Sequence, residues 1–249
     1  MGINSGPSST DGNWIGGHEC VRDSLVFWMD SGDIRSYSGT GTGVEDLSQY
    51  DNDGTLTNGP TFSNGTFDFD GTNDYIDFGD VVTYEWGYNT NYTLCAWFYL
   101  DGDTNSMIMS KARSSGTYRG WYLFYAASTN FIYNALYSDA QRWRNRTDSA
   151  LSMSTWYHVA ATHAWYAGGV SGHTGKTYIN GEEVTTILDY DTLVSETTTG
   201  TTEPFSIGMR NTTNAPFNGK IPIVQMYDRI LSESEVKYNF NADRGRFGI

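Results

Sequence analysis

The chain has 249 residues, with 15 Lys and Arg against 29 Asp and Glu, and so carries a formal net charge of −14. Such an acidic chain repels nucleic-acid phosphates and the anionic surface of membranes, which excludes nucleic-acid partners. No apolar run approaches the roughly 18 residues that a spanning helix needs, which excludes membrane insertion. Aromatic residues make up 15% of the chain, a content typical of a folded protein and not of a disordered one.

The length fits a single all-β domain, because sandwiches of about 200 to 250 residues are common. We expect an N-terminal arm at 1–20, which begins with Gly, Ser, Asn and Asp, and one folded domain at 21–249. The first twenty residues lack the charged and apolar regions of a secretory signal, so we expect no cleaved leader. Cys20 and Cys95 are expected to be buried free thiols, with one disulfide between them as the alternative.

Strand patterns dominate the chain. Runs of β-branched and aromatic residues, separated by turn residues, predict an antiparallel β-sandwich. The predicted strands lie at 92–100, 107–110, 120–126, 131–137, 156–163, 176–180, 204–209 and 220–227. Asn-Gly pairs at 58–59, 64–65, 180–181 and 218–219 predict turns between strands.

One short helix is predicted near the C-terminal end. Ser232 offers an N-cap hydroxyl, and Glu235 follows three residues later, which is the pattern of a capping box. The apolar residues Val236, Tyr238 and Phe240 come next. The predicted fold class is therefore an all-β antiparallel sandwich with one short C-terminal helix.

Four groups of stretches in a fixed order carry a family pattern. They are VRDSLVFWMD at 21–30 with SYSGTGT at 36–42; EDLSQYDNDGTLTNGPTF at 45–62; FDFDGTNDYIDF at 67–78 with the strand that contains Trp97, WYHV at 156–159 and YING at 178–181; and FNGK at 217–220 with VQMYDRILS at 224–232. Together they resemble the laminin-G-like, concanavalin A-type jelly-roll lectin family. The resemblance implies a jelly-roll sandwich, carbohydrate binding, and one structural Ca²⁺ ion.

Three further stretches point to a narrower group. MGINSGP at 1–7, VRDSLVFWMDSGDIRSYSGTGT at 21–42 and NFNADRGRFGI at 239–249 resemble the version of this domain found in tailed-bacteriophage virion proteins. The resemblance implies a place on the virion surface, outside the cell, as a capsid decoration, tail or fibre protein. It implies other virion proteins as partners, in an oligomer or larger assembly.

Catalysis is not expected. Glycosidases of this sandwich place carboxylates at alternating positions of one strand, so that an acid and a nucleophile share a cleft. The closest spacings here, Asp68 with Asp70, Asp189 with Asp191, and Glu233 with Glu235, do not reproduce the three-carboxylate pattern of those enzymes. We therefore predict no catalytic residues, with a glycoside hydrolase as the least favoured alternative.

Calcium is the metal that the acidic turns suit, because it takes oxygen ligands from short loops. The candidate ligands are Asp46, Asp51 and Asp53 in one acidic turn, and Asp70 and Asp74 in another. The alternative is that these side chains bond to the backbone of their own turns. Both interpretations stay open at this stage.

A basic and aromatic segment, YSDAQRWRNR at 137–146, stands out in an acidic chain. One interpretation makes Arg142, Trp143 and Arg144 a ligand-contact surface, since Arg and Trp are enriched at binding hot spots. The other follows strand alternation, with the arginines, including Arg146, on a solvated face and Trp143 packed inward.

Two other aromatic positions are candidates. Trp165 and Tyr166 precede glycines and suggest an exposed loop tip that contacts a ligand. Trp97 lies on the face of strand 92–100 opposite Leu94 and Phe98, where it belongs either to a binding groove or to a second layer of core. The core interpretation is favoured for Trp97.

The predicted function is a non-enzymatic virion structural protein that contacts neighbouring coat or fibre subunits and binds host-surface glycans. A free carbohydrate-binding lectin is the first alternative, and a glycoside hydrolase is the second.

Overall fold

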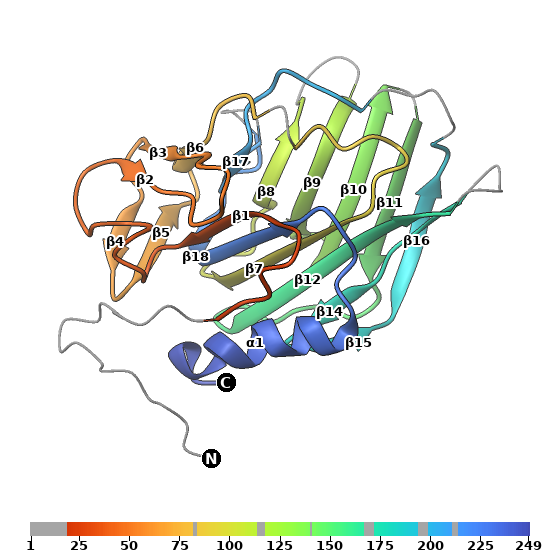
Figure 1. The fold of residues 1–249 in the computed structure, drawn as a ribbon. Coiled ribbons are helices and arrows are strands. Elements are labelled where there is room, and N and C mark those ends of the chain that lie inside the picture. Colours follow the sequence, from red (N-terminus) through yellow and green to blue (C-terminus); the bar gives the residue numbers. More distant parts are fainter. Residues whose placement is uncertain are drawn as a thin grey trace.

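A computed structural model describes residues 19–81, 84–113, 118–139, 141–166, 172–193, 199–210 and 214–249. Two antiparallel β-sheets pack face to face, and one helix follows them at the C-terminal end (Figure 1). This confirms the predicted β-sandwich with its helix. Residues 1–18 of the predicted N-terminal arm lie outside the described residues.

The first sheet has the strand order β15-β14-β12-β7-β18-β5-β4, with β1 paired to β18 and β13 paired to β12. Its strands are β1 (Leu25–Asp30), β4 (Thr61–Ser63), β5 (Thr66–Asp70), β7 (Tyr92–Leu100), β12 (Trp156–Trp165), β13 (His173–Thr174), β14 (Thr177–Ile179), β15 (Glu182–Val184) and β18 (Asn218–Tyr227). Neighbouring strands far apart in sequence, such as β7 and β18, are typical of a jelly roll.

The second sheet has the order β16-β11-β10-β9-β8-β17-β6-β3-β2. Its strands are β2 (Gly43–Val44), β3 (Gly54–Thr57), β6 (Tyr75–Asp77), β8 (Ser106–Ala112), β9 (Tyr118–Ala126), β10 (Phe131–Asp139), β11 (Gln141–Thr147), β16 (Thr186–Asp191) and β17 (Ser206–Ile207). The longest strands, β9 to β11, form successive hairpins in this sheet.

Most of the predicted Asn-Gly turns are confirmed. Asn64 and Gly65 join β4 to β5, and Asn180 and Gly181 join β14 to β15, each pair with positive φ as a tight hairpin turn requires. The prediction at 218–219 is wrong, because Asn218 and Gly219 lie inside β18. A side chain at Gly219 would place its Cβ only 2.0 Å from the Tyr99 carbonyl oxygen of β7, so the glycine serves close strand approach.

The main core lies between the two sheets and is rich in aromatic side chains. Leu94 and Phe98 of β7 face this layer from the first sheet, and Trp121, Leu123 and Trp143 face it from the second. All five side chains are almost completely buried. Each contributes roughly 1.5–3 kcal/mol by leaving water, which is why the chain folds around these rows.

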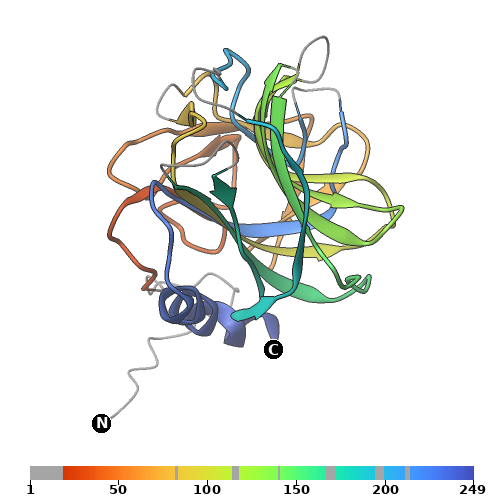
Figure 2. The same ribbon diagram turned by 90° about the vertical axis from the view of Figure 1, so that its right-hand side faces the viewer.

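A second layer of core lies under helix α1 (Glu233–Phe247), on the outer face of the first sheet (Figure 2). Ser232 and Glu235 form the predicted capping box at its start. Trp97 is 1% exposed and packs against Phe240 and Phe247 of the helix, with ring centroids 5.6 and 4.4 Å apart. The favoured core interpretation of Trp97 is therefore confirmed.

The helix makes the two outer faces of the sandwich unequal. It packs against β12 and β15 of the first sheet, while the described part of the chain places no helix over the second sheet. No helix among the described residues has the length and apolar character to cross a membrane. Among the described residues, the helix therefore covers the outer face of the first sheet alone.

Candidate functional site

The outer face of the second sheet carries a row of aromatic side chains. Strand pairing sets Phe124 of β9 opposite Tyr133 of β10, and Tyr122 opposite Ala135. Ala135 in turn pairs with Arg144 of β11. Because Ala135 is small, the longer side chains beside it close over it and leave it fully buried. We call this face, from β8 to β11, the tyrosine groove.

Two adjacent hollows open along the tyrosine groove, with volumes of about 380 Å³ and 220 Å³. Asn105, Tyr122 and Phe124 line both of them. Arg210 lies in the larger hollow and Arg144 in the smaller one. The larger hollow is within the size range of small-molecule sites. Because the two hollows share lining residues, they lie side by side on the sheet.

Tyr122, which lines both hollows, stacks on Tyr137, which lines neither. The Tyr122 and Tyr137 rings lie 5.5 Å apart at an interplanar angle of 27°, and their hydroxyl oxygens are 3.0 Å apart in a hydrogen bond. Burial raises the pKa of Tyr122, and the neighbouring Tyr137 raises it further. The hydroxyl of Tyr122 therefore stays protonated and can donate or accept a hydrogen bond.

The arginines of β11 lie next to this tyrosine pair, because β11 pairs with β10. The Nη2 atom of Arg144 donates to Asp189 of β16 at 2.9 Å, and the Arg146 Nε atom donates to the same carboxylate at 3.2 Å. Arg144 also lies over the Tyr133 and Tyr190 rings, 5.0 and 4.8 Å from their centroids. These contacts hold the guanidinium group against the wall of the groove.

In the basic segment predicted to bind a ligand, the arginine side chains are partly exposed and the tryptophan side chain is buried. Arg142 and Arg144 point outward, and Arg142 stacks on Tyr190 at 3.6 Å. Trp143 is 0% exposed and packs in the main core, edge-on to His163 at 4.6 Å. Trp143 as a ligand contact is therefore wrong, because strand alternation turns it inward, and the alternation interpretation is confirmed.

Trp165 and Tyr166 lie at the end of β12, outside the two hollows. Trp165 is half-buried with its ring edge-on to Tyr88 at 5.9 Å, while Tyr166 is 62% exposed. The rest of the predicted loop tip, 167–169, lies outside the described residues. A ligand role for this pair stays a prediction, separate from the tyrosine groove.

The first acidic turn uses its carboxylates to hold its own backbone. Asp46 is buried and accepts hydrogen bonds from the Trp28, Ser48 and Asn52 amides at 3.0, 2.9 and 3.2 Å. Burial raises the pKa of Asp46, although these donors oppose the rise. Asp53 accepts from the Asp46 amide at 2.9 Å, and neighbouring Asp51 takes a positive φ of 51°.

The second acidic turn behaves in the same way. Asp70 accepts from the Thr72 amide at 2.7 Å, and Asp74 accepts from the Asp70 amide at 3.0 Å. Across the described ranges, no three His, Cys, Asp or Glu side chains gather into a group that could hold a metal ion. Calcium stays a prediction, and a melting temperature that a chelator leaves unchanged would contradict it.

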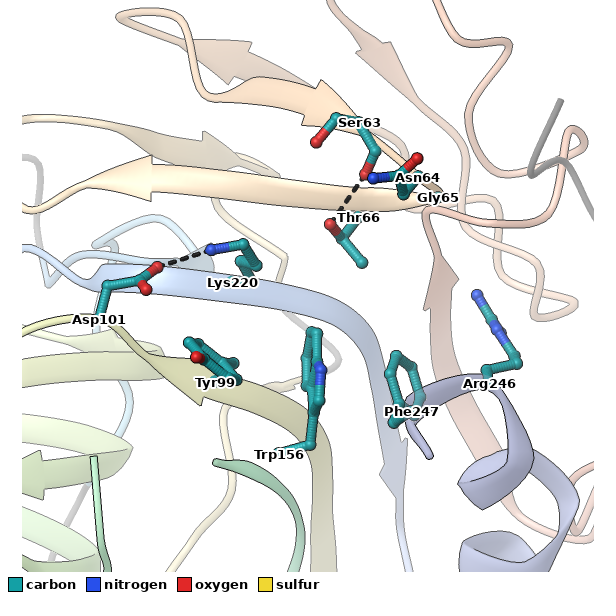
Figure 3. Close-up of a pocket in the computed structure, with 10 residues that line it drawn as sticks. All are labelled: Ser63, Asn64, Gly65, Thr66, Tyr99, Asp101, Trp156, Lys220, Arg246 and Phe247. Carbon is teal, nitrogen blue, oxygen red and sulfur yellow. Dashed lines mark hydrogen bonds and ion pairs between the residues drawn. The ribbon is translucent and has the colours of Figure 1, made fainter. Parts of the chain in front are cut away.

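A further pocket of about 390 Å³ lies beside the C-terminal end of α1, on the first sheet (Figure 3). Its charged groups are already paired. The Lys220 ammonium contacts Asp101 at 2.7 Å and Asp68 at 3.2 Å, and Arg246 forms two hydrogen bonds with buried Asp30, at 2.7 and 2.8 Å. The charged side chains of this pocket are therefore engaged with the protein itself.

Sequence reasoning missed most of the groove. Tyr122 and Phe124 alternate with the inward-facing Trp121, Leu123 and Tyr125, but both sets are apolar, so the pattern does not tell the outer face from the core. Arg210 comes from a segment with no strand pattern of its own. Only Arg142 and Arg144 gave a signal, through their charge in an acidic chain.

Comparison with known proteins supports the fold. A family model described as Laminin_G_3, concanavalin A-like lectin/glucanases superfamily, matches residues 70–237. A search of curated proteins gives no match.

Solved structures with a similar fold include a Trypanosoma rangeli sialidase in complex with sialic acid, with a TM-score of 0.61 and 18% identity over 90% of this chain. The binding domain of botulinum neurotoxin DC in complex with SialylT is similar at a TM-score of 0.59 and 14% identity over 89% of this chain. This chain spans 33% of the sialidase and 52% of the toxin domain. The family model covers well over half of the residues, so the chain belongs to the Laminin_G_3 family of the concanavalin A-like lectin/glucanases superfamily.

Proposed function

We propose that this chain is a non-catalytic carbohydrate-binding protein and that the tyrosine groove is its glycan site. The observation that carries the proposal is the pair of adjacent hollows lined by aromatic rings and hydrogen-bonding side chains on the open face of the second sheet. Aromatic rings offer apolar faces to the C–H groups of a sugar, and tyrosine hydroxyls and arginines can bond to its oxygens.

The absence of a carboxylate pair supports a binding role without catalysis. Glycoside hydrolysis generally needs two carboxyl groups at a set separation across the sugar. Among the described residues that line the two hollows, none is Asp or Glu. The carboxylate of Asp189 on β16 is held by Arg144 and Arg146. This argues against a two-carboxylate glycoside hydrolase mechanism in the groove.

The solved structures of similar fold add limited support for the ligand class. The Trypanosoma rangeli sialidase was solved with sialic acid, and the botulinum toxin domain with SialylT. At identities of 18% and 14%, the likeness is one of fold, and the sugars in those two structures are consistent with the proposed ligand class.

A glycan array with purified protein tests the proposal. We expect binding to a subset of glycans that falls about fivefold in Phe124→Ala and in Tyr133→Ala, since a stacked aromatic contact is worth about 1 kcal/mol. Tyr238→Ala is the matched control, because this tyrosine is 47% exposed on α1, across the sandwich from the groove. Absence of binding to every glycan, or equal loss in the control, would contradict the proposal.

We also propose that the protein works on the surface of a bacteriophage virion, bound to other coat, tail or fibre proteins. The support is the resemblance of 21–42 and 239–249 to virion proteins, together with an acidic chain that does not attract nucleic acid. The gene's neighbours provide the test. Adjacent capsid or tail genes are expected, and a neighbourhood without any phage structural gene would contradict the virion role.

A further inference from the structure

Each hollow of the tyrosine groove contains one arginine that the protein does not fully satisfy. The Nε–H groups of Arg144 and Arg210 are buried and have no hydrogen-bond partner. A buried donor without a partner costs free energy, so both side chains gain from a ligand oxygen that meets the unused capacity.

The electrostatic balance of this face is positive, although the whole chain carries −14. On β11, the arginines at 142, 144 and 146 all point outward, and Asp189 is the carboxylate that pairs with two of them. Arg210 adds a fourth guanidinium across the groove. The local surplus of positive charge would attract an anion, and the acidic surface elsewhere would repel it.

The geometry of the donors favours a carboxylate. An arginine fork presents two parallel N–H groups that match the two oxygens of a carboxylate. Tyr122 lines both hollows, and its ring centroid lies 5.9 Å from the guanidinium carbon of Arg210, while its hydroxyl is hydrogen-bonded to Tyr137. Aromatic rings beside each arginine can stack on the sugar ring that carries the acid.

We propose that the tyrosine groove selects glycans with carboxylate-bearing sugars, one acidic unit per hollow, with Arg144 and Arg210 as the acid-binding residues. The inference rests on the proposed glycan-binding function and adds the class of sugar. Two adjacent hollows that share Tyr122 and Phe124 suit successive acidic units of a single oligosaccharide.

Calorimetric titration of the full chain with two matched probe sets tests the proposal. The first set is 3′-sialyllactose, 3′-sulfated lactose and neutral lactose. The second is trigalacturonate and its methyl-esterified, uncharged form. We expect at least one carboxylated probe to bind about tenfold more tightly than its neutral partner, the gain of one charge-assisted hydrogen-bond pair. The proposal is overturned if no carboxylated probe exceeds its neutral partner, or if sulfated lactose binds more tightly than every carboxylated probe.

Substitutions assign the effect to the two arginines. Arg144→Gln and Arg210→Gln should each weaken the preferred carboxylated probe about tenfold and weaken its neutral partner by clearly less, so that the preference for the acid falls. Arg144→Lys should restore only part of the loss, because lysine keeps the charge but not the fork. Arg22→Gln is the control, since it removes the same charge beside Trp28, on the face with the helix. An acid preference that survives in the double variant Arg144→Gln/Arg210→Gln overturns the proposal.

The outcomes separate this inference from the proposed function. Equal binding of acidic and neutral probes, lost in Phe124→Ala, would keep the glycan site and overturn the acid selectivity. Absence of binding to any probe and to the whole array would overturn both. Circular dichroism and melting temperatures of every variant exclude unfolding as the cause of a loss.

Discussion

At the scale of single residues, the inward orientation of Trp143 determines which side chains of β11 are exposed. Alternation sends Trp143 into the core and the arginines on either side of it outward. The pattern in the sequence allowed this arrangement but did not require it, because a loop would expose all of these side chains. The pairing of β11 with β10 and β16 settles it, since a strand that is hydrogen-bonded on both edges must alternate.

Trp143→Ala is predicted to lower stability and not to remove a binding contact. The side chain is fully buried against His163, and its loss leaves a large cavity that costs about 3–5 kcal/mol. Urea denaturation should show this loss, while calorimetric affinity per folded molecule stays unchanged. Trp165→Ala is the comparison, with a smaller loss because its ring is only half-buried. A variant of wild-type stability that no longer binds glycans would contradict this assignment.

At the scale of elements, the sequence predicted those helices and strands whose residue pattern is compatible with one kind of structure. The capping box at Ser232 and the strand Tyr92–Leu100 were predicted at their observed positions. β16 was not predicted, because its sequence TILDYD mixes acidic and apolar residues and only pairing with β11 makes it a strand. The turn predicted at Asn218-Gly219 was wrong. A glycine also permits close approach of two strand backbones, and Gly219 lies where β18 approaches β7 closely.

The candidate site depends on contacts between elements and was therefore only partly predictable. Arg144 and Arg210 are 66 positions apart in sequence, yet both line hollows that share Tyr122. No local pattern connects such residues. The acidic turns were the opposite case, since each Asp bonds to amides a few residues away, and local reasoning gave the turn-capping alternative correctly.

At the scale of the whole molecule, stability is expected to fall in mild acid because histidines are buried. Burial lowers the pKa of His158 and of His163 to about 3, against 6.5 in an unfolded chain. Below pH 6.5 the unfolded state binds these protons and the folded state does not. Each histidine therefore lowers the free energy of unfolding by about 1.4 kcal/mol per pH unit, from about pH 6.5 down to about pH 3.

Urea denaturation at pH 7, 6 and 5 measures this slope in a range where most carboxylates stay ionised. His158→Leu should reduce the slope, because the histidine lies between Trp97 and Phe240 and its Nδ1 atom has no hydrogen-bond partner. Its stability at pH 7 should be largely retained. A slope identical to that of the wild-type chain would show that His158 is not the group that resists protonation.

The position of α1 also makes the two outer faces of the sandwich different. Val21 donates to Asn239 of the helix at 2.9 Å, so the first described residues and the C-terminal helix meet on one side of the sandwich (Figure 1). The tyrosine groove lies on the opposite side, on the outer face of the second sheet. A tether at either end would therefore hold the protein on the side opposite the tyrosine groove and turn the proposed glycan site outward, the orientation that adhesion to a facing surface requires.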